Sequence, residues 1–321
     1  MSNALKIWLI VAASLVLAGG LLFVGVMSAV KWDFSKLVTR SLVTDTHEIQ
    51  EEFQHITIKT DTADVRLLPS EDGVARVVCR AYEEMRHTVS VLDGTLVIET
   101  EDTRAWYDHI GIFAGGDEIK VYLPAKVYGS FSLKASTGDV LVASELALTT
   151  ADVAVSTGDV HFKASATETI KIKTDTGWIL MSDVIAKNAE LTVGTGSVTM
   201  SDTTFTEDLS VTCTTGDVRL LNVTCRDLTS TANTGDLDMK DVLANGAFLL
   251  KRTTGDVDME RCDAAEIYVT TGTGDVEGSL LSEKIFVVKT STGDVEVPRS
   301  ASGGICEITT STGDIEIELC D

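Results

Sequence analysis

The sequence predicts an all-β fold, a parallel β-solenoid of about ten coils preceded by one transmembrane helix. Three observations carry this prediction: an uncharged apolar run near the N-terminus, a turn motif that recurs ten times, and a spacing of 19 or 20 residues between its copies. A period that holds to one residue over nine steps is typical of a solenoid, in which each repeat contacts only its neighbours.

The composition is that of a folded and strongly acidic protein. The 321 residues include 26 Lys and Arg against 49 Asp and Glu, a net charge of −23, and 44% of them are hydrophobic. A hydrophobic share of this size is typical of globular chains rather than disordered ones. The negative field repels phosphate backbones, which argues against a nucleic-acid partner.

Residues 7–30 form an uncharged apolar run that predicts a transmembrane helix after a short tail of residues 1–6. At 1.5 Å per residue the run spans about 36 Å, enough for a hydrocarbon core of about 30 Å. Trp8 and Trp32 flank the run, as interfacial aromatic residues do. A cleaved signal peptide is the alternative, but ten apolar residues follow its best cleavage site at Gly20, too many for a short signal. We therefore expect an uncleaved anchor whose partner is the lipid bilayer.

The charges that flank the anchor conflict with its expected orientation. Lys6 precedes the anchor and Lys31, Lys36 and Arg40 follow it, so the positive-inside rule would leave the C-terminal bulk in the cytoplasm. The downstream chain is rich in Thr, Ser and Asp, as exported repeat domains are. We weigh this composition above the small charge difference. We expect a single-pass cell-membrane protein whose C-terminal domain is extracellular, joined to the anchor by a linker at residues 31–46.

A turn motif punctuates residues 131–321, which we assign to the solenoid. The string Ser-Thr-Gly-Asp-Val occurs at Ser136–Val140, Ser156–Val160 and Ser291–Val295, and looser copies bring the total to ten. The glycines of the ten copies are Gly138, Gly158, Gly177, Gly196, Gly216, Gly235, Gly255, Gly274, Gly293 and Gly313. With each glycine as position 0, position −1 is threonine in every copy and position +1 is aspartate in eight.

Apolar residues alternate on both sides of each glycine, at positions −7, −5 and −3 and again at +2 and +4. Alternation with a period of two predicts strands with one face inward, so that Val211, Val269 and Val288 at −5 are core residues. The parity changes across Thr-Gly-Asp, which indicates a corner. A third inward position recurs at +7, as at Cys262 and Leu281. We expect each coil to pair in parallel with the next coil in the sequence.

Ten coils at about 4.8 Å each would make a rod about 45 Å long. The handedness rule for parallel strands joined by crossovers favours a right-handed coil. Residues 47–130 lack the strict turn but alternate as strands do, and Thr62–Val65 is a degenerate corner. Terminal repeats of solenoids are atypical because they cover the open end of the core. This stretch is therefore either an irregular β cap or a small β domain that leads into the solenoid.

An N-terminal anchor, a strand-rich lead-in and repeated Ser-Thr-Gly-Asp-Val corners together resemble the bacterial "putative adhesin" β-strand-repeat family, a family of unknown function. The resemblance covers Lys6 to Asp321. It implies a surface-exposed, membrane-tethered β-solenoid of a bacterium, linked to adhesion or envelope stress. It implies no catalytic residues.

The six cysteines are expected to be free. Cys213 at −3, Cys306 at −7, and Cys262 and Cys320 at +7 all occupy positions that other coils fill with apolar residues. A disulfide needs Cα atoms within about 7 Å, and therefore two cysteines in one column of adjacent coils. Cys262 and Cys320 share a column but are three coils apart in the sequence. We interpret the thiols as small core hydrophobes, and without a C-x-x-C motif zinc binding has no support.

No residue pattern supports catalysis. The five histidines are scattered, and the one locally dense group of functional side chains, Trp106–His109, is interpreted as a surface loop or cap contact. Enzymatic β-helices carry their sites in clefts formed by long loops, and coils that vary by one residue leave no room for them. We expect a protein that is not an enzyme and needs no cofactor.

Acidic side chains accumulate on the outward side of the last five coils. Positions +1 and +3 are both acidic there, at Asp236, Asp238, Asp256, Asp258, Asp275, Glu277, Asp294, Glu296, Asp314 and Glu316. Like charges about 4.8 Å apart repel unless they are capped or neutralised. We expect the +1 aspartates to cap backbone N–H groups. The alternative is Ca²⁺ binding by these ten carboxylates, although the corners lack the Gly-Gly-x-Gly-x-Asp pattern of Ca²⁺-binding β-rolls.

Two functional interpretations remain. The first is a non-enzymatic, membrane-anchored extracellular β-solenoid, an adhesin-like surface module that binds a cell-surface partner or acts as a scaffold. The second is an envelope-stress sensor or regulatory subunit that acts with a membrane-protein partner. In the second case Gly19, Gly20 and Gly25 would allow another helix to approach closely.

Overall fold

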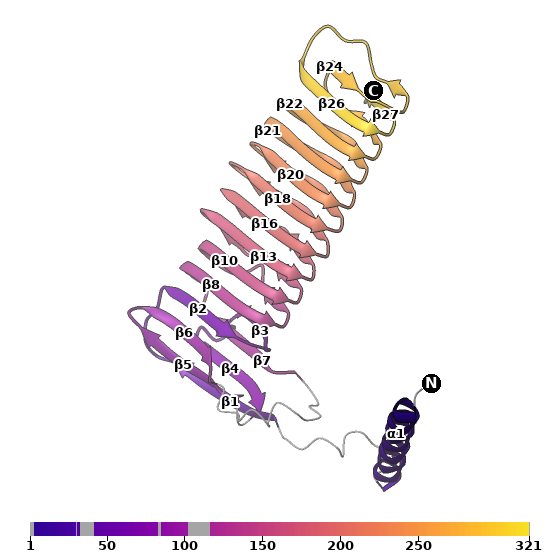
Figure 1. The fold of residues 1–321 in the computed structure, drawn as a ribbon. Coiled ribbons are helices and arrows are strands. Elements are labelled where there is room, and N and C mark those ends of the chain that lie inside the picture. Colours follow the sequence, from indigo (N-terminus) through magenta and orange to yellow (C-terminus); the bar gives the residue numbers. More distant parts are fainter. Residues whose placement is uncertain (1–2, 30, 33–41, 83–84, 102–115, 321) are drawn as a thin grey trace.

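The structure is a computed structural model that describes residues 3–29, 31–32, 42–82, 85–101 and 116–320. Figure 1 shows one N-terminal helix and a long rod of stacked strands, with β1 near one end of the rod and the C-terminus at the other. The predicted fold class is confirmed, because the described chain is nearly all-β, a parallel solenoid of about ten turns after one apolar helix.

The helix α1 (Asn3–Ala29) coincides with the predicted apolar run. Its segment Lys6–Ala29 has a mean hydropathy of 2.6 and is the one helix in the described chain that is long and apolar enough to cross a membrane. Large apolar side chains on all sides of it are exposed, among them Leu15 and Leu21. No part of its most apolar 18-residue window is buried inside the described chain.

The first seven strands form one end of the rod. They are β1 (Leu42–Ile49), β2 (His55–Thr60), β3 (Asp64–Pro69), β4 (Ala75–Tyr82), β5 (His87–Leu92), β6 (Thr95–Thr100) and β7 (Glu118–Leu123). Strands β2 and β3 make a complete coil, because the degenerate corner between them stacks on the first solenoid coil. On its other side this coil pairs with β6 and β7. The antiparallel strands β1, β4 and β5 complete this end.

This end differs from the sequence interpretation in one boundary. Strand β1 begins at Leu42, inside the segment assigned to the linker at 31–46. It pairs in antiparallel register with β4, with Asp45 opposite Cys79. Alternation in β1 is weak because its residues are half-buried or exposed, so period-two patterning could not reveal it. The predicted dense group Trp106–His109 lies outside the described residues.

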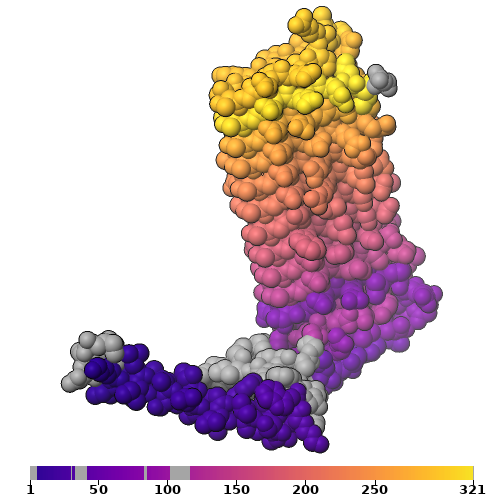
Figure 2. All heavy atoms as spheres, turned by 90° about the vertical axis from the view of Figure 1, so that its right-hand side faces the viewer, coloured from indigo at the N-terminus to yellow at the C-terminus, as the bar shows by residue number. Residues whose placement is uncertain are grey.

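The remaining strands form the coils of the solenoid. They are β8 (Val127–Thr137), β9 (Val140–Val142), β10 (Ala147–Thr157), β11 (Val160–Phe162), β12 (Ser165–Ala166), β13 (Thr169–Thr176), β14 (Ile179–Ser182), β15 (Ile185–Ala186), β16 (Asn188–Thr195), β17 (Val198–Phe205), β18 (Leu209–Thr215), β19 (Val218–Cys225), β20 (Leu228–Thr234), β21 (Leu237–Thr254), β22 (Val257–Thr273), β23 (Val276–Leu280), β24 (Lys284–Lys289), β25 (Val295–Glu296), β26 (Gly304–Thr312) and β27 (Ile315–Leu319). The pairs between coils are parallel and join equivalent positions, such as Val211 with Ser230. Figure 2 shows the continuous column that results.

The core runs through the centre of the rod and is built from the predicted inward columns. Val211 and Val269 at position −5 are fully buried, as predicted, whereas Val288 is only partly buried. The prediction of Leu281 as inward is wrong. A register shift between Met259 and Cys262 places Leu280 against Cys262, so that Leu281 is exposed.

The order of the last coils differs from the predicted order. Strand β26 of the Gly313 coil pairs with β22 on one side and with β24 on the other, and β27 likewise lies between β23 and β25. The Gly313 coil is therefore inserted between the Gly274 and Gly293 coils. Gly303 and Gly304 permit the return, because a Cβ on either would lie within 1.8 Å of a carbonyl oxygen of a neighbouring coil. The Gly293 coil, residues 281–303, is thus the terminal coil of the rod.

Candidate functional site

The Thr-Gly-Asp corners stack closely enough to require glycine. Gly216 has a φ of +133°, and a Cβ built on it would lie 1.9 Å from the carbonyl oxygen of Gly196 in the coil below. An L-residue adopts such a conformation only under strain. The recurring glycine is therefore explained by the approach of one corner to the next.

The aspartates at +1 form a ladder along these corners. In each step, the backbone N–H of one +1 residue donates to Oδ1 of the +1 aspartate in the neighbouring coil at 2.7–3.1 Å. The ladder connects Asp64, Asp139, Asp159 and Trp178, and then Asp217, Asp236, Asp256, Asp275, Asp314 and Asp294. It is interrupted where Trp178 and Ser197 replace aspartate. The capping role expected for the +1 column is thus observed as hydrogen bonds between coils.

The +3 side chains form a second outward column, whose character changes along the rod. Leu141, His161 and Leu180 occupy it near the N-terminal end, and Arg219 separates them from the acidic half. The acidic half runs in space as Asp238, Asp258, Glu277, Glu316 and Glu296. This order corrects the expected sequence of the stacked pairs, because Asp314 and Glu316 lie between Asp275 and Asp294 in the ladder.

Burial and like charges raise two pKa values in the middle of the acidic half. Burial and the nearby Asp238 and Glu260 raise the pKa of Asp258 above 3.8. Burial and the nearby Glu316 raise the pKa of Glu277 above 4.5. Two neighbouring carboxylates form ion pairs with basic side chains. Arg219 Nε lies 2.9 Å from Asp238 Oδ2, and Lys240 Nζ lies 2.6 Å from Glu260 Oε1.

The geometry does not assemble these carboxylates into a cation site. A hollow of about 210 Å³ lies beside the corner and is lined by Asp236, Asp238, Asp256, Asp258, Asp275 and Glu277. Within the described residues no three His, Cys, Asp or Glu side chains form a group that could hold a metal ion. Each of Asp236, Asp256 and Asp275 also uses Oδ1 to accept a backbone N–H of the next coil. Ca²⁺ binding by these carboxylates therefore stays a prediction.

The cysteines are all free, and five of the six are buried. Burial raises the pKa of Cys79, Cys225, Cys262 and Cys306 to about 12. A thiol held this far from ionisation is a poor nucleophile at neutral pH. Cys320 is half-buried rather than inward. Because the Gly313 coil is inserted, Cys320 lies two coils from Cys262 instead of three, with Leu280 between them.

One serine–histidine pair escaped the sequence interpretation. Ser130 Oγ and His55 Nδ1 lie 2.8 Å apart on the exposed surface, 75 residues apart in the chain. The backbone N–H of Ser130 also donates to the same nitrogen at 3.1 Å. Nucleophilic serines need a base oriented by a third group. In the described part of the chain, no carboxylate hydrogen-bonds to the His55 ring, and the pair joins β2 to β8.

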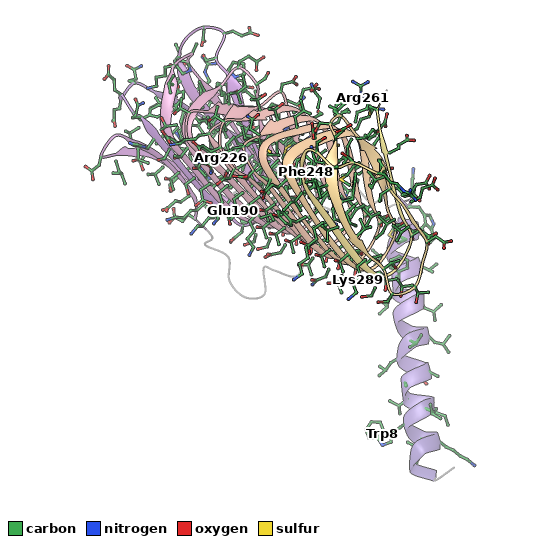
Figure 3. The ribbon with its side chains drawn as sticks, turned by 90° about the horizontal axis from the view of Figure 1, so that it is seen from above. Trp8, Glu190, Arg226, Phe248, Arg261 and Lys289 are labelled. Atoms are coloured by element: carbon green, nitrogen blue, oxygen red, sulfur yellow. The ribbon has the colours of Figure 1, made fainter. Side chains whose placement is uncertain are left out.

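A second series of corners, which stack along the rod at position +6, was not predicted from the sequence either. Position +6 has a positive φ in five successive coils, at Asp183, Asp202, Asn222, Asp241 and Arg261. Asn and Asp tolerate this left-handed conformation better than other residues. Their recurrence six residues after glycine was the available signal. The side chains bond between coils, as in Arg261 Nε to Asp241 at 2.8 Å, and Figure 3 shows Arg261 on the outside of the rod.

Two buried cations were not predicted either. Arg252 lies at −3 in the core and is 1% exposed. It donates to Ser230 Oγ and to the carbonyl of Lys251, and burial lowers its pKa to about 10. Lys284, 3% exposed, binds Asp263 at 2.6 Å and joins the terminal coil to the body of the rod. No periodicity predicts Arg252, because its position is apolar or neutral in every other coil. The burial of Lys284 is not predicted either, because four other coils also carry a charged residue at its position, namely Glu168, Lys187, Glu207 and Arg226.

The chain is similar to several solved structures at low sequence identity. A putative adhesin from Bacteroides fragilis has 17% sequence identity and a TM-score of 0.37, over 88% of this chain and 98% of that one. A putative adhesin from Parabacteroides distasonis has 11% identity and a TM-score of 0.45, over 88% and 98%. A putative lipid binding protein from the same species has 11% identity and a TM-score of 0.41, over 87% and 97%. No curated protein matches the chain.

The match that identifies the chain is to a family model. The model of the family Toastrack DUF4097 matches residues 53–226 and 222–321. These ranges contain the complete coil of β2 and β3, all ten Thr-Gly corners and the inserted Gly313 coil. The chain therefore belongs to the Toastrack DUF4097 family.

Proposed function

We propose that the chain is a non-enzymatic surface module, a rigid β-solenoid that α1 holds in the cell membrane and that binds or spaces other molecules outside the cell. The observation that carries the proposal is the combination of an apolar helix exposed on all sides with a rod of uniform coils. The helix requires a lipid partner to bury its side chains. The rod provides reach and a repeated surface in place of an enclosed cleft.

The uniform coils support a binding or spacing role over catalysis. Function in solenoids usually resides on an extended surface made by the stack. Here the outward +3 column presents Leu141, His161 and Leu180 at one end of the rod and carboxylates at the other. Trp178 stands out on this face, because it replaces a ladder aspartate and is 63% exposed. Trp178 lies at the corner between β13 and β14, and tryptophan is enriched among the residues that contribute most to binding at interfaces.

Protease treatment of intact cells tests the location. We expect protease added to intact protoplasts to remove the solenoid of the full chain, and to leave a membrane fragment that contains α1. A cytoplasmic protein that survives the same treatment is the control. Full protection of the solenoid would place it in the cytoplasm, as the charges that flank α1 suggest. Release of an intact solenoid without protease would show that α1 is a cleaved signal peptide.

The open face of α1 supports the second candidate, a sensor or regulatory subunit. A Cβ built on Gly19, Gly20 or Gly25 would meet no heavy atom within 4 Å. Small residues in a membrane helix let a second helix approach closely. In vivo cross-linking of the full chain with Gly19 and Gly20 both replaced by Leu tests this. The sensor role predicts a membrane protein that cross-links to the natural chain and is lost from the variant.

A further inference from the structure

The terminal coil leaves the end of the hydrophobic core open. Val295 at position +2 is 45% exposed, whereas Val276 and Ile315 in the same column of the two coils beneath it are at most 1% exposed. Phe286 and Val288 on β24 are only partly buried. A hollow of about 650 Å³ lies against the terminal coil and is lined by Phe286, Val295, Glu296, Val297, Pro298, Arg299, Ser300 and Ala301.

The terminal coil also carries a free strand edge. Strand β24 pairs with β26 on one side, and no strand in the described chain pairs with it on the other. Its outward side chains Ile285 and Val287 are 42% and 54% exposed. Proteins usually protect such an edge with prolines, charges or a covering element, because an open apolar edge accepts another strand. The other end of the rod has such a cover in its antiparallel strands β1, β4 and β5.

We propose that this tip binds a second copy of the chain, tip to tip, through antiparallel pairing of β24 with β24 across a two-fold axis. In an antiparallel pair, opposite residues point to the same face. An axis at Val287 places Val287 opposite its own copy, Phe286 opposite Val288, and Ile285 opposite Lys289. The inward residues of the two copies then continue one core, and no like charges stand opposite each other. Figure 3 shows Lys289 at the outer surface, where its ammonium group stays in water.

Charge also favours a second copy as the occupant. The whole chain carries −23, which opposes self-association in general. The terminal coil is an exception: residues 281–303 contain three acidic and three basic side chains. These are Glu283, Lys284, Lys289, Asp294, Glu296 and Arg299. The terminal coil, which has the open core and the free edge, therefore carries no net charge that would repel a second copy.

The position of the tip sets the arrangement of the two copies. The tip lies at the end of the rod farthest from β1, the strand that follows α1 (Figure 1). Two chains joined at their tips would point their helices in opposite directions, so that each helix lies in a different membrane. The partner of the proposed surface module would then be a second copy of the chain, anchored in an opposed membrane. The opposed-membrane arrangement rests on the proposed function.

Single full-length chains in lipid nanodiscs test the pairing. We expect sedimentation velocity of the discs at micromolar concentrations to show, besides single discs, particles that contain two chains and two discs. Val287→Lys should abolish these particles, because a lysine on the edge would face its own copy. The matched control is Leu249→Lys, since Leu249 lies in the same outward column in the middle of the rod and is 46% exposed.

Cross-linking fixes the register. With Val287→Cys, mild oxidation should join two chains, because opposite residues across the axis have Cα atoms about 4.5–5.5 Å apart. Leu249→Cys should not join them. Single discs alone, two-disc particles that persist in Val287→Lys, or two chains paired within one disc would each overturn the proposal. Since the assay does not depend on which side of the cell membrane the rod occupies, its failure would leave the proposed location to the protease experiment.

Discussion

The same five residues, Ser-Thr-Gly-Asp-Val, meet two different environments in this protein. At Ser136–Val140 the valine is 1% exposed, and at Ser291–Val295 it is 45% exposed. The two glycines have similar φ values, +131° at Gly138 and +142° at Gly293. The local sequence therefore determines the corner, whereas the presence of a neighbouring coil on each side determines the burial. Stability in such a rod arises between coils rather than within them.

The largest expected difference between the two environments concerns a buried charge. Val211→Asp should lower the free energy of unfolding by about 4 kcal/mol or more, because it places an unpaired carboxylate between two coils. Val288→Asp should cost about 1–2 kcal/mol, because the terminal coil leaves that side chain partly open to water. Urea unfolding of the two variants measures both values. Equal losses would contradict the open core at the tip.

Corner glycines offer the next test. Gly216→Ala should cost about 3 kcal/mol or more, because the new methyl group would overlap the carbonyl oxygen of Gly196 in a strained backbone. Gly293→Ala meets the same obstacle at the carbonyl oxygen of Gly313, 2.1 Å away. The terminal coil has one neighbour and can separate from it. We therefore expect a loss of hydrogen-exchange protection confined to the terminal coil. Global destabilisation by Gly293→Ala would show that the tip unfolds only with the whole rod.

The repeat made most of the fold predictable. Ten corners at a constant spacing and alternating apolar residues were sufficient for the fold class, the inward columns and the free cysteines, because each depends on local sequence and period. The order of coils at the two ends was not predictable in this way. A coil of identical pattern can stack on either side of its neighbour, so the connecting segments determine the order of the coils. The only sequence signal for the inserted coil is the dipeptide Gly303-Gly304.

The candidate sites were predictable to a smaller extent. The capping role of the +1 aspartates followed from their place beside a glycine corner. The left-handed residues at +6 were present as recurring Asp and Asn, but Arg261 hides the pattern in one coil. Arg252 could not be found, because it is the one charged residue in an apolar or neutral column. The burial of Lys284 could not be found, because other coils also carry charged residues at its position. The open end of the core lies on the Gly293 coil because the Gly313 coil is inserted before it. It could not be predicted without the order of the coils.

Removal of ladder aspartates should have a smaller effect that again depends on position. Asp256 Oδ1 accepts the backbone N–H of Asp275 at 2.8 Å. Asp256→Ala should therefore cost about 1 kcal/mol, the value of a typical hydrogen bond. Asp294 ends the ladder, and no described backbone N–H donates to its carboxylate, so Asp294→Ala should cost less than about 0.5 kcal/mol. Thermal melts of the two variants provide the comparison. A larger loss for Asp294 would contradict the terminal position of its coil.

The smallest effect, a stabilisation, is expected in the acidic half of the +3 column. Burial and, to a smaller extent, like charges raise the pKa of Asp258 and Glu277 in the folded state. Protonation therefore favours the folded state, and this contribution to stability increases as the pH falls through the raised values toward 3.8 and 4.5. Replacing both residues by Thr should raise the melting temperature at neutral pH by a few degrees at most. The gain should vanish in acid, where the natural side chains are uncharged.

Asp227 is the matched control, because the N–H of Ala247 and the neighbouring Arg226 lower its pKa. Asp227→Asn should lower the melting temperature at neutral pH, and this loss should disappear as the pH falls. Cations then separate repulsion from binding. Repulsion alone predicts that NaCl, Mg²⁺ and Ca²⁺ at equal ionic strength raise the melting temperature of the natural chain equally and without saturation. A Ca²⁺ ladder predicts a saturating effect that Mg²⁺ does not reproduce and that the double Thr variant loses. We expect the first result, because the +1 carboxylates are already engaged with backbone N–H groups.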